Sequence, residues 1–378
     1  MQKVFVGMSG GVDSSVAAML LVGQGYDVTG VYMKNWSRDL PGMKCPWAED
    51  LADAKRVAVK LGIDFEVWDF EKEYREKVVD YMLDEFRKGN TPNPDIMCNQ
   101  EIKFKLFYEK AMATGADFIA TGHYARIKRD TSPCSFLMRA VDENKDQTYF
   151  LYRMSQEALE HTLFPIGEMM KPDVKKLAAE NGLHNAYKKE SMGVCFVGEV
   201  GMKDFLKEYI DIEPGEIREI ESERLLGYHE GAVFYTIGQR HGLYLDGEKG
   251  VVNDGMPYYV VKKDIESNIV YVSKNLNDKN LWVNELKLCD VLLRTNSVTA
   301  RHFATNGERV SEEPCNNWSD EVCRKMNILV RLRHRAPLIP AKFDGETLYF
   351  ENEIKRPASG QSAVLYDGEV CLGGGIIL

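Results

Sequence analysis

Two cysteines stand in surroundings that could make a thiol reactive. Cys98 follows the stretch Pro92–Met97 and precedes a predicted helix. A thiol at a helix N-terminus has its pKa lowered, because the helix dipole stabilises the thiolate. Asp95 is close enough to act as a base, although its charge opposes that shift. Cys195 lies in the apolar run 192–198, whose glycines predict a mobile loop. Either thiol could instead be a small buried side chain.

A second chemical feature is the segment SGGVDSS at 9–15, between a predicted strand at 4–6 and an apolar helix over 16–22. Glycines let backbone N–H groups approach an anion, hydroxyls add donors, and a helix N-terminus attracts negative charge. The segment lacks both the Lys-Ser/Thr pair of a P-loop and the G-x-G-x-x-G spacing. It therefore predicts a different phosphate site. Asp13 could orient this loop, hold a metal or cap the helix.

Alternating strands and helices are expected to position these groups. The spacing of apolar residues predicts strands over 27–33, 65–68 and 117–121, and helices over 48–61, 74–86 and 101–113. Two prolines predict an extended loop over 90–99. The alternation is typical of an α/β, doubly wound parallel sheet that binds ligands at the carboxyl ends of its strands.

From about Pro165 the pattern changes. A short helix is expected over 172–182, and glycine-punctuated strands follow at 251–252, 258–261 and 269–272. Later strands over 329–332, 347–350, 363–365 and 370–372 favour a C-terminal antiparallel β-barrel, interrupted by a polar surface insertion at 301–324. We predict three domains: 1–210 with a helical excursion near 166–188, a small β-rich domain over 211–280, and the barrel over 281–378.

Composition narrows the class of protein. A chain of 378 residues is long enough for two or three domains. Its net charge of -10 argues against indiscriminate nucleic-acid binding, but it allows a local basic track. The eight cysteines form no C-x-x-C pair, so a zinc ribbon is unsupported. Without a leader or a membrane-spanning apolar run, the protein is expected to be cytoplasmic and to make no membrane contact.

Seven segments together resemble the signatures of the bacterial tRNA-specific 2-thiouridylase family, which installs sulfur at C2 of the wobble uridine of tRNA. They are SGGVDSS at 9–15, NPD-x-x-CN at 93–99, TGHYAR at 121–126, KDQ-x-YFL at 145–151, GVCF at 193–196, TIGQR at 236–240 and GQSA at 360–363. The resemblance runs nearly from end to end. It implies a PP-loop ATPase domain of the adenine nucleotide alpha hydrolase-like fold, a small central domain and a tRNA-contacting barrel.

The resemblance also implies roles for individual residues. Cys98 would be the nucleophile and Cys195 the persulfide carrier, the two able to form a disulfide after sulfur leaves, with Asp95 as a candidate base. The residues that would bind ATP are Gly7, Met8, Ser9, Gly10, Gly11, Val12, Asp13, Ser14, Met33 and Gly122. Those that would contact the target base are Asn93, Pro94 and Asp95. Those that would contact tRNA are His123, Lys145, Asp146, Gln147, Arg333, His334 and Gln361.

Some expectations concern partners and cofactors. The resemblance implies ATP with Mg²⁺, no permanent metal, a tRNA substrate and a persulfide donor that is a cysteine desulfurase or a relay protein. The free protein is expected to be a monomer. His334 stands where the family has tyrosine. Further phosphate contacts are expected from the basic residues Arg126, Lys128, Arg129, Arg331, Arg333 and Arg335.

The implied chemistry explains why both the phosphate loop and the two cysteines are needed. Oxygen on an amide-like carbon leaves poorly, and adenylation turns it into a good leaving group. Sulfur could then arrive by either of two routes. Cys98 attacks the inner persulfide sulfur and releases hydrosulfide, or the terminal sulfur attacks the carbon directly. The residues leave both routes open.

Three other hypotheses fit part of the pattern. An amide or amidine ligase would use the same loop with a nitrogen nucleophile and would need neither cysteine. Cys98, Cys195 and a third thiol such as Cys45 could instead hold an iron-sulfur cluster. A non-catalytic tRNA-binding protein would keep the loop only as a remnant.

Overall fold

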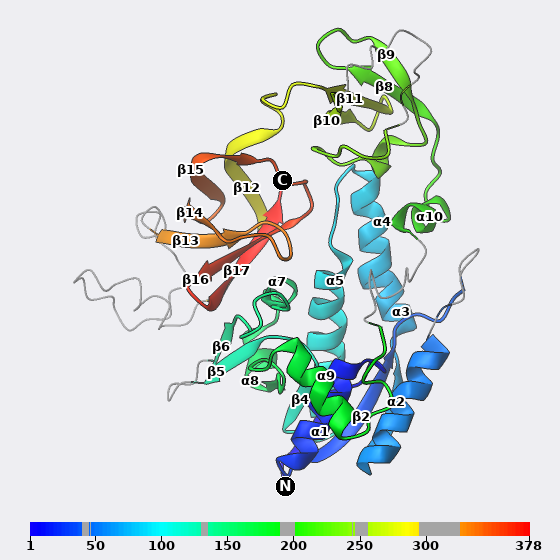
Figure 1. Ribbon diagram of the computed structural model, residues 1–378, viewed down its shortest axis with the longest axis vertical. Helices are drawn as coiled ribbons and strands as arrows, with labels where there is room; N and C mark the ends of the chain where they lie inside the picture. The colour runs from blue at the N-terminus through cyan, green and yellow to red at the C-terminus, as the bar shows by residue number, and fades with distance from the viewer. Residues whose placement is uncertain are drawn as a thin grey trace, which may run out of the picture.

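The computed structural model describes residues 1–39, 45, 47–129, 135–189, 201–243, 245, 256–294 and 326–378. It has three parts, each built around its own sheet (Figure 1). Cys195, the predicted strand at 251–252 and the predicted insertion at 301–324 lie outside the described residues. The domain boundaries near 210 and 280 therefore stay predictions.

The first part is a five-stranded parallel sheet in the order β3-β2-β1-β4-β7. Its strands are β1 (Lys3–Gly7), β2 (Asp27–Lys34), β3 (Asp64–Asp69), β4 (Phe118–Thr121) and β7 (Thr162–Leu163). Side chains of the central strand β1 alternate between two cores, with Val4 and Val6 in one and Phe5 in the other. Both faces are covered, so the predicted doubly wound sheet is confirmed.

Helices fill the crossovers between these strands. α1, α2 and α9 join the core that contains Val4 and Val6, whereas α4, η2 and α6 join the core that contains Phe5. The helical segments are α1 (Val12–Gly23), α2 (Trp47–Leu61), α3 (Glu71–Tyr74), η1 (Arg75–Val79), α4 (Asp80–Arg87), α5 (Pro94–Met97), η2 (Cys98–Leu106), α6 (Phe107–Ala113), α7 (Thr148–Leu151), α8 (Gln156–Glu160), α9 (Lys171–Glu180) and α10 (Met202–Lys207).

The predicted extended loop over 90–99 is wrong in its second half, because a helix begins at Pro94. Proline is tolerated at the first helical position, where its missing N–H would have no partner within the helix. Asn93 caps this helix: its side chain accepts hydrogen bonds from the backbone N–H groups of Asp95 (3.2 Å) and Ile96 (3.4 Å). Cys98 consequently lies one turn inside a helical run and not at its N-terminus.

The central part is a four-stranded sheet in the order β10-β11-β8-β9. Its elements are β8 (Gly215–Glu219), β9 (Leu225–His229), the 3-10 turn η3 (Ala232–Phe234), β10 (Tyr259–Asp264) and β11 (Ile269–Ser273). Val260, Val270 and Val272 are fully buried in its core. Two of the strands predicted for this region, at 258–261 and 269–272, are thus confirmed.

The C-terminal part is the expected antiparallel β-barrel. Six strands follow one another in the order β12-β15-β14-β13-β16-β17, and a pairing between β12 and β17 closes the ring. They are β12 (Trp282–Leu293), β13 (Met326–Arg331), β14 (Ile339–Phe343), β15 (Thr347–Lys355), β16 (Ser362–Asp367) and β17 (Val370–Ile377). A hairpin from the first part, β5 (Arg126–Arg129) and β6 (Ser135–Met138), adds to this sheet through β17.

The barrel is fixed to the first part through the segment around α7. The Tyr149 hydroxyl donates a hydrogen bond to the Ser362 carbonyl (3.0 Å), and Arg153 forms an ion pair with Asp290 (2.6 Å). Arg294, which is buried, donates to the carbonyls of Leu151 and Tyr152 (both 3.3 Å). These contacts make the barrel and the parallel sheet neighbours, although they are far apart in sequence.

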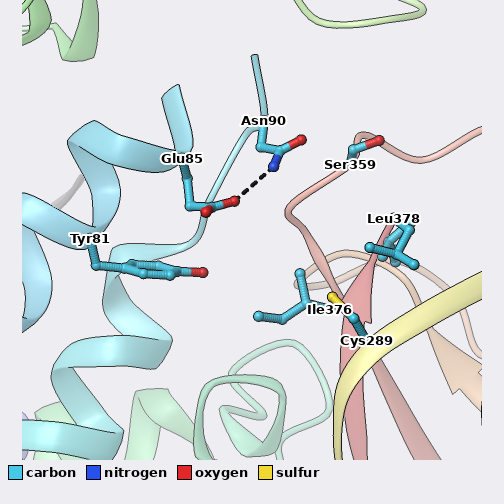
Figure 2. Close-up of a pocket in the computed structure, with 8 residues that line it drawn as sticks. Tyr81, Glu85, Asn90, Cys289, Ser359, Ile376 and Leu378 are labelled. Carbon is cyan, nitrogen blue, oxygen red and sulfur yellow. Dashed lines mark hydrogen bonds between the residues drawn. The ribbon is translucent and has the colours of Figure 1, made fainter. Parts of the chain in front are cut away.

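A cleft of about 210 Å³ remains between α4 and the barrel. Figure 2 shows its lining, where Asn90 donates a hydrogen bond to Glu85 (2.7 Å). The lining residues are Tyr81, Glu85, Asn90, Cys289, Ser359, Ile376, Ile377 and Leu378. Burial raises the pKa of Tyr81 to about 12, so its hydroxyl stays neutral. This cleft borders the end of β17 and lies apart from the phosphate loop.

Within the described ranges, no helix combines the length and the apolar character needed to cross a bilayer.

Candidate active site

The segment SGGVDSS forms the end of the turn after β1 and the first turn of α1, at the carboxyl edge of the parallel sheet. Gly10 has a φ of +76°, and a Cβ at this position would lie 2.4 Å from the carbonyl oxygen of Asp50. Glycine is therefore required both by backbone conformation and by space. The Ser14 hydroxyl accepts a hydrogen bond from the backbone N–H of Ser9 (3.2 Å). The result is a tight loop whose hydroxyls and backbone N–H groups meet at the start of a helix.

Asp13 is bound by groups from outside the loop. Both of its carboxylate oxygens lie 2.7 Å from Nζ of Lys171, and one accepts a hydrogen bond from the Tyr124 hydroxyl (3.1 Å). The N-cap of α1 is Gly11, and no side chain in the described part of the chain caps the helix. Of the roles considered for Asp13, the cap is thus wrong, and orientation of the loop agrees with its contacts.

Two further predicted ATP-binding residues lie against this loop. A Cβ on Gly122 would come within 2.5 Å of the backbone nitrogen of Ser14. A Cβ on Gly7 would lie 2.9 Å from the Met33 methyl group. β1, β2 and β4 therefore bring Gly7, Met33 and Gly122 together at one edge of the sheet, as ligand binding in this fold requires.

The segment α5–η2 carries Asp95 and Cys98. Burial raises the pKa of Asp95, and the nearby charge of Lys103 opposes this shift only in part. A carboxylate with a raised pKa is a stronger base, as a proton acceptor requires. Cys98 is buried, with 2% of its surface exposed. The next residue, Asn99, donates a hydrogen bond to the carbonyl of Phe150 (3.1 Å), which ties this helix to α7.

His123 follows β4 and is buried. Its Nδ1 lies 2.8 Å from the Thr121 hydroxyl, and its ring contacts Phe104 (5.7 Å between ring centres) and Phe164 (6.1 Å). Burial lowers the pKa of His123 well below its usual value, so the ring is neutral. These contacts seat η2 over the carboxyl end of β4. The predicted contact of His123 with tRNA stays a prediction.

The predicted tRNA-binding run Lys145–Gln147 is largely engaged within the protein. Asp146 is almost fully buried and forms a 2.6 Å ion pair with Arg331 of the barrel. The Gln147 side chain accepts a hydrogen bond from the backbone N–H of Tyr124 (2.8 Å). Lys145 is only partly buried. The run therefore joins the phosphate-loop part to the barrel, whatever contact it makes with RNA.

The barrel brings the remaining predicted residues to the same region. The His334 ring packs on Phe150, with 4.5 Å between ring centres, and burial lowers the pKa of His334 to about 4. Arg333 is exposed beside it. Gln361 donates a hydrogen bond to the carbonyl of Thr91 (2.6 Å), just before α5. The structure thus brings Arg333, His334 and Gln361 close to the helix of Cys98.

Several basic residues expected at phosphates have partners inside the protein. Arg331 pairs with Asp146, Arg126 forms an ion pair with Glu369 (3.0 Å), and Arg129 donates to the carbonyl of Thr162 (2.7 Å). Lys128, Arg333 and Arg335 are exposed, and so is Arg129 despite its hydrogen bond. The exposed set is therefore the better candidate for RNA phosphates.

The other three described cysteines are, like Cys98, at least partly buried. Burial raises the pKa of Cys45 and Cys289, and it raises the pKa of Cys371 to about 11. Thiols of this kind are neutral at physiological pH and react slowly as nucleophiles. Among the described residues, no group of three or more His, Cys, Asp or Glu side chains is arranged to hold a metal ion.

Sequence reasoning assigned no role to three residues that shape the loop. Lys171 and Tyr124 bind Asp13, and Asn185 donates hydrogen bonds to the Gly10 carbonyl and the Ser15 hydroxyl (both 2.9 Å). Of these three residues, only Lys171 stands in a sequence context that could have drawn attention to it. It is the first residue of α9, and a positive charge is unfavourable at a helix N-terminus.

Three family models match successive parts of the chain: a tRNA methyl transferase HUP domain over residues 2–199, a tRNA methyl transferase PRC-barrel domain over 203–274, and an aminomethyltransferase beta-barrel domain over 313–377. A solved 4-thiouridine synthetase–RNA complex with bound ATP is 16% identical, with a TM-score of 0.36, and covers 55% of this chain and 50% of that one. That similarity is too low to carry an argument.

Curated relatives are similar over nearly the whole chain. The tRNA-specific 2-thiouridylase of Levilactobacillus brevis is 44% identical over 378 residues, which cover 99% of this chain and 95% of that protein. The tRNA-specific 2-thiouridylase of Geobacillus kaustophilus is 45% identical over 377 residues, with 100% and 95% covered. Because the match extends from the phosphate loop to the barrel, the chain belongs to the tRNA-specific 2-thiouridylase family.

Proposed function

We propose that the chain is a tRNA 2-thiouridylase that adenylates the C2 oxygen of a wobble uridine and replaces it with sulfur. The products would be 2-thiouridine, AMP and pyrophosphate. One observation carries this proposal: the phosphate loop at the end of β1 and the helix of Cys98, seated over the end of β4, meet at the same edge of the sheet. An activated carbonyl and a thiol could both be reached there.

The loop would bind the phosphates of ATP through backbone N–H groups of residues 9–14 and the hydroxyls of Ser9 and Ser14. Met33 and Gly122 would border the nucleoside side. Mg²⁺ would accompany the phosphates, since Asp13 is already bound by Lys171 and no carboxylate cluster offers a resident metal site among the described residues. Uridine O2 would bond to the α-phosphorus as pyrophosphate leaves.

Sulfur would come from a persulfide on Cys195. In one route the Cys98 thiolate attacks the inner sulfur, the S–S bond breaks and hydrosulfide leaves, adds to C2 and displaces AMP. In the other, the terminal sulfur adds to C2 and displaces AMP, and the Cys98 thiolate then attacks the inner sulfur, which breaks the S–S bond and leaves the terminal sulfur on C2. Both routes end in a Cys98–Cys195 disulfide, which a two-electron thiol reductant must reopen. Asp95 would accept the Cys98 proton, and its raised pKa supports this role.

The substrate would be held by groups around this edge. Asn93, Pro94 and Asp95 would border the flipped base, which costs little to extrude from a single-stranded loop. Arg333, His334, Gln361, Lys145 and Lys128 would contact the anticodon region, and the exposure of Arg333 and Lys128 supports this. Activity would take place in the cytoplasm, where reductants keep thiols available.

The test is mass analysis of wobble nucleosides after incubation with tRNA, ATP and a persulfide source. The wild-type protein should form 2-thiouridine and AMP. Cys98→Ser should still release AMP and form no 2-thiouridine. Cys289→Ser is the matched control, since this half-buried thiol faces the cleft near β17. AMP release without any 2-thiouridine, by the wild type as well as by Cys98→Ser, would favour a ligase that uses a nitrogen nucleophile, and no AMP release by the wild type would favour a binding protein.

A further inference from the structure

The two most exposed large apolar side chains of the described residues, apart from Met1, are Tyr187 (84%) and Val59 (81%). Val59 lies near the end of α2, and Tyr187 lies in the segment that follows α9. Contact of apolar surface with water is unfavourable, so a partner that covers an exposed valine or tyrosine gains free energy of binding. The proposed chemistry assigns neither residue a role.

Contacts between the two segments place that of Tyr187 beside the helix of Val59. The segment after α9 runs alongside α2 in the opposite direction. It begins beside Lys60, because a Cβ on Gly182 would lie 3.0 Å from Nζ of Lys60. His184 then binds Asp53 (3.0 Å), and Lys188 binds Asp53 (2.6 Å) and Asp50 (2.8 Å). Asp53 itself is buried. The segment is thus fixed to α2, and Tyr187 projects from this fixed segment.

The middle of this surface is basic, although exposed Glu49, Asp64 and Glu180 stand at its edges and Arg56 pairs with Asp53 (2.8 Å). Between 53 and 60 and between 182 and 189, the exposed residues are Lys55, Arg56, Val59, Lys60, Gly182, His184, Tyr187 and Lys189. None of them is a carboxylate, although the whole chain has a net charge of -10. We call these eight residues the α2 face. It lies on the outer side of the sheet, away from the barrel (Figure 1).

We propose that the α2 face docks the protein that delivers sulfur: a protein that carries a persulfide on its own cysteine and presents it from an acidic, partly apolar surface. This rests on the proposed function, in which Cys195 receives the sulfur. Cys195 follows Lys189 by only a few residues. A persulfide passes between proteins only when the two sulfur atoms touch, so the donor must bind close to that segment.

The composition of the face favours a protein over RNA. Phosphates would engage the lysines, but valine offers a base neither a stacking surface nor a hydrogen bond. Protein interfaces, by contrast, combine exposed apolar and tyrosine side chains with a rim of charges that steers a complementary partner. An acidic partner would also avoid the predominantly acidic remainder of this chain.

The experiment compares two sulfur sources on the same variants. One source is a cysteine desulfurase of the same organism, loaded with persulfide from L-cysteine, and the other is sodium hydrosulfide, which needs no docking. The test variants are Val59→Asp/Tyr187→Asp and Lys55→Glu/Lys60→Glu. Matched controls are Tyr228→Asp on β9, where the tyrosine is 52% exposed, and Lys342→Glu on β14. The readout is the initial rate of 2-thiouridine formation.

We expect both test variants to lose about 10-fold or more with the desulfurase, as for interface residues that contribute strongly to binding, and to match the wild type with hydrosulfide. Controls should match it with both sources. The proposal would be overturned if the test variants reached the wild-type rate with the desulfurase. It would also be overturned if they lost the same fraction of activity with both sources, because this would indicate damage to the enzyme. Weaker, less salt-dependent tRNA binding would assign the face to RNA instead. A wild-type protein active only with hydrosulfide would exclude direct delivery by this donor. Inactivity with both sources would refute the proposed function itself.

Discussion

Nζ of Lys171 lies 2.7 Å from both carboxylate oxygens of Asp13, and these two residues are 158 positions apart in the chain. The Lys171 side chain is only 8% exposed, whereas that of Asp13 is 30% exposed. An unpaired carboxylate in a phosphate-binding loop would repel the anion that the loop binds. The lysine removes that repulsion and keeps a positive charge beside the site.

Replacing Lys171 by methionine should therefore impair adenylation. We expect tRNA-dependent AMP release to fall by about 100-fold, the usual effect of removing one charge-stabilising donor from an active site. The measurement is single-turnover AMP release at saturating tRNA. Lys176→Met is the control, because Lys176 is an exposed lysine of the same helix.

The outcome also separates catalysis from folding. A double variant Lys171→Met/Asp13→Asn should recover stability, because no charge is left unpaired, but it should not recover AMP release. AMP release by Lys171→Met at the wild-type rate would contradict a role for this ion pair in adenylation.

Features that depend on a local sequence pattern can be predicted from the sequence. The glycine and hydroxyl loop between a strand and a helix placed Gly7–Ser14 correctly at the sheet edge, since the neighbouring residues alone determine that geometry. The start of the helix before Cys98 is harder to predict, because prolines within a segment usually indicate a break, whereas Asn93 and Pro94 together make a helix start.

Features carried by contacts between distant residues were not predictable. The sequence around Lys171 does not indicate that Asp13 is its partner, and the buried ion pair of Asp146 with Arg331 depends on how the barrel packs on the first part. Residues of the same type illustrate the limit. Arg331 is buried in an ion pair while Arg333, two positions later, is exposed, and only the barrel fold distinguishes them.

Gly122→Ala should damage the phosphate loop from the neighbouring strand. A Cβ there would lie 2.5 Å from the Ser14 nitrogen and 2.6 Å from the Asp13 carbonyl carbon, and both are backbone atoms that cannot move aside cheaply. We expect ATP affinity, measured by calorimetry, to fall by at least about 10-fold. Gly23→Ala is the control, because a Cβ at Gly23 meets nothing within 4 Å. Unchanged affinity in Gly122→Ala would show that the loop tolerates displacement.

The buried pair of Asp146 and Arg331 should contribute strongly to stability. Arg331→Met leaves the buried carboxylate of Asp146 with only the more distant Arg139 (3.9 Å) and should destabilise the protein by about 3–5 kcal/mol. Asp146→Asn/Arg331→Met should recover much of that loss, because neither charge then remains. Urea unfolding followed by circular dichroism measures both. Additive losses in the double variant would indicate that the two residues act independently.

His334 should make stability fall in weakly acidic solution. Burial and nearby arginines lower its pKa from 6.5 to about 4, and its buried Nδ1 has no hydrogen-bond partner among the described residues. Between these values the unfolded chain binds a proton that the folded protein rejects, so acid favours unfolding. His334→Phe keeps the ring on Phe150 and removes this titration. The wild type should lose stability relative to the variant as pH falls from 6.5 to 4, with a constant difference above 6.5. Urea midpoints measured across that range test this, and parallel curves would contradict the lowered pKa.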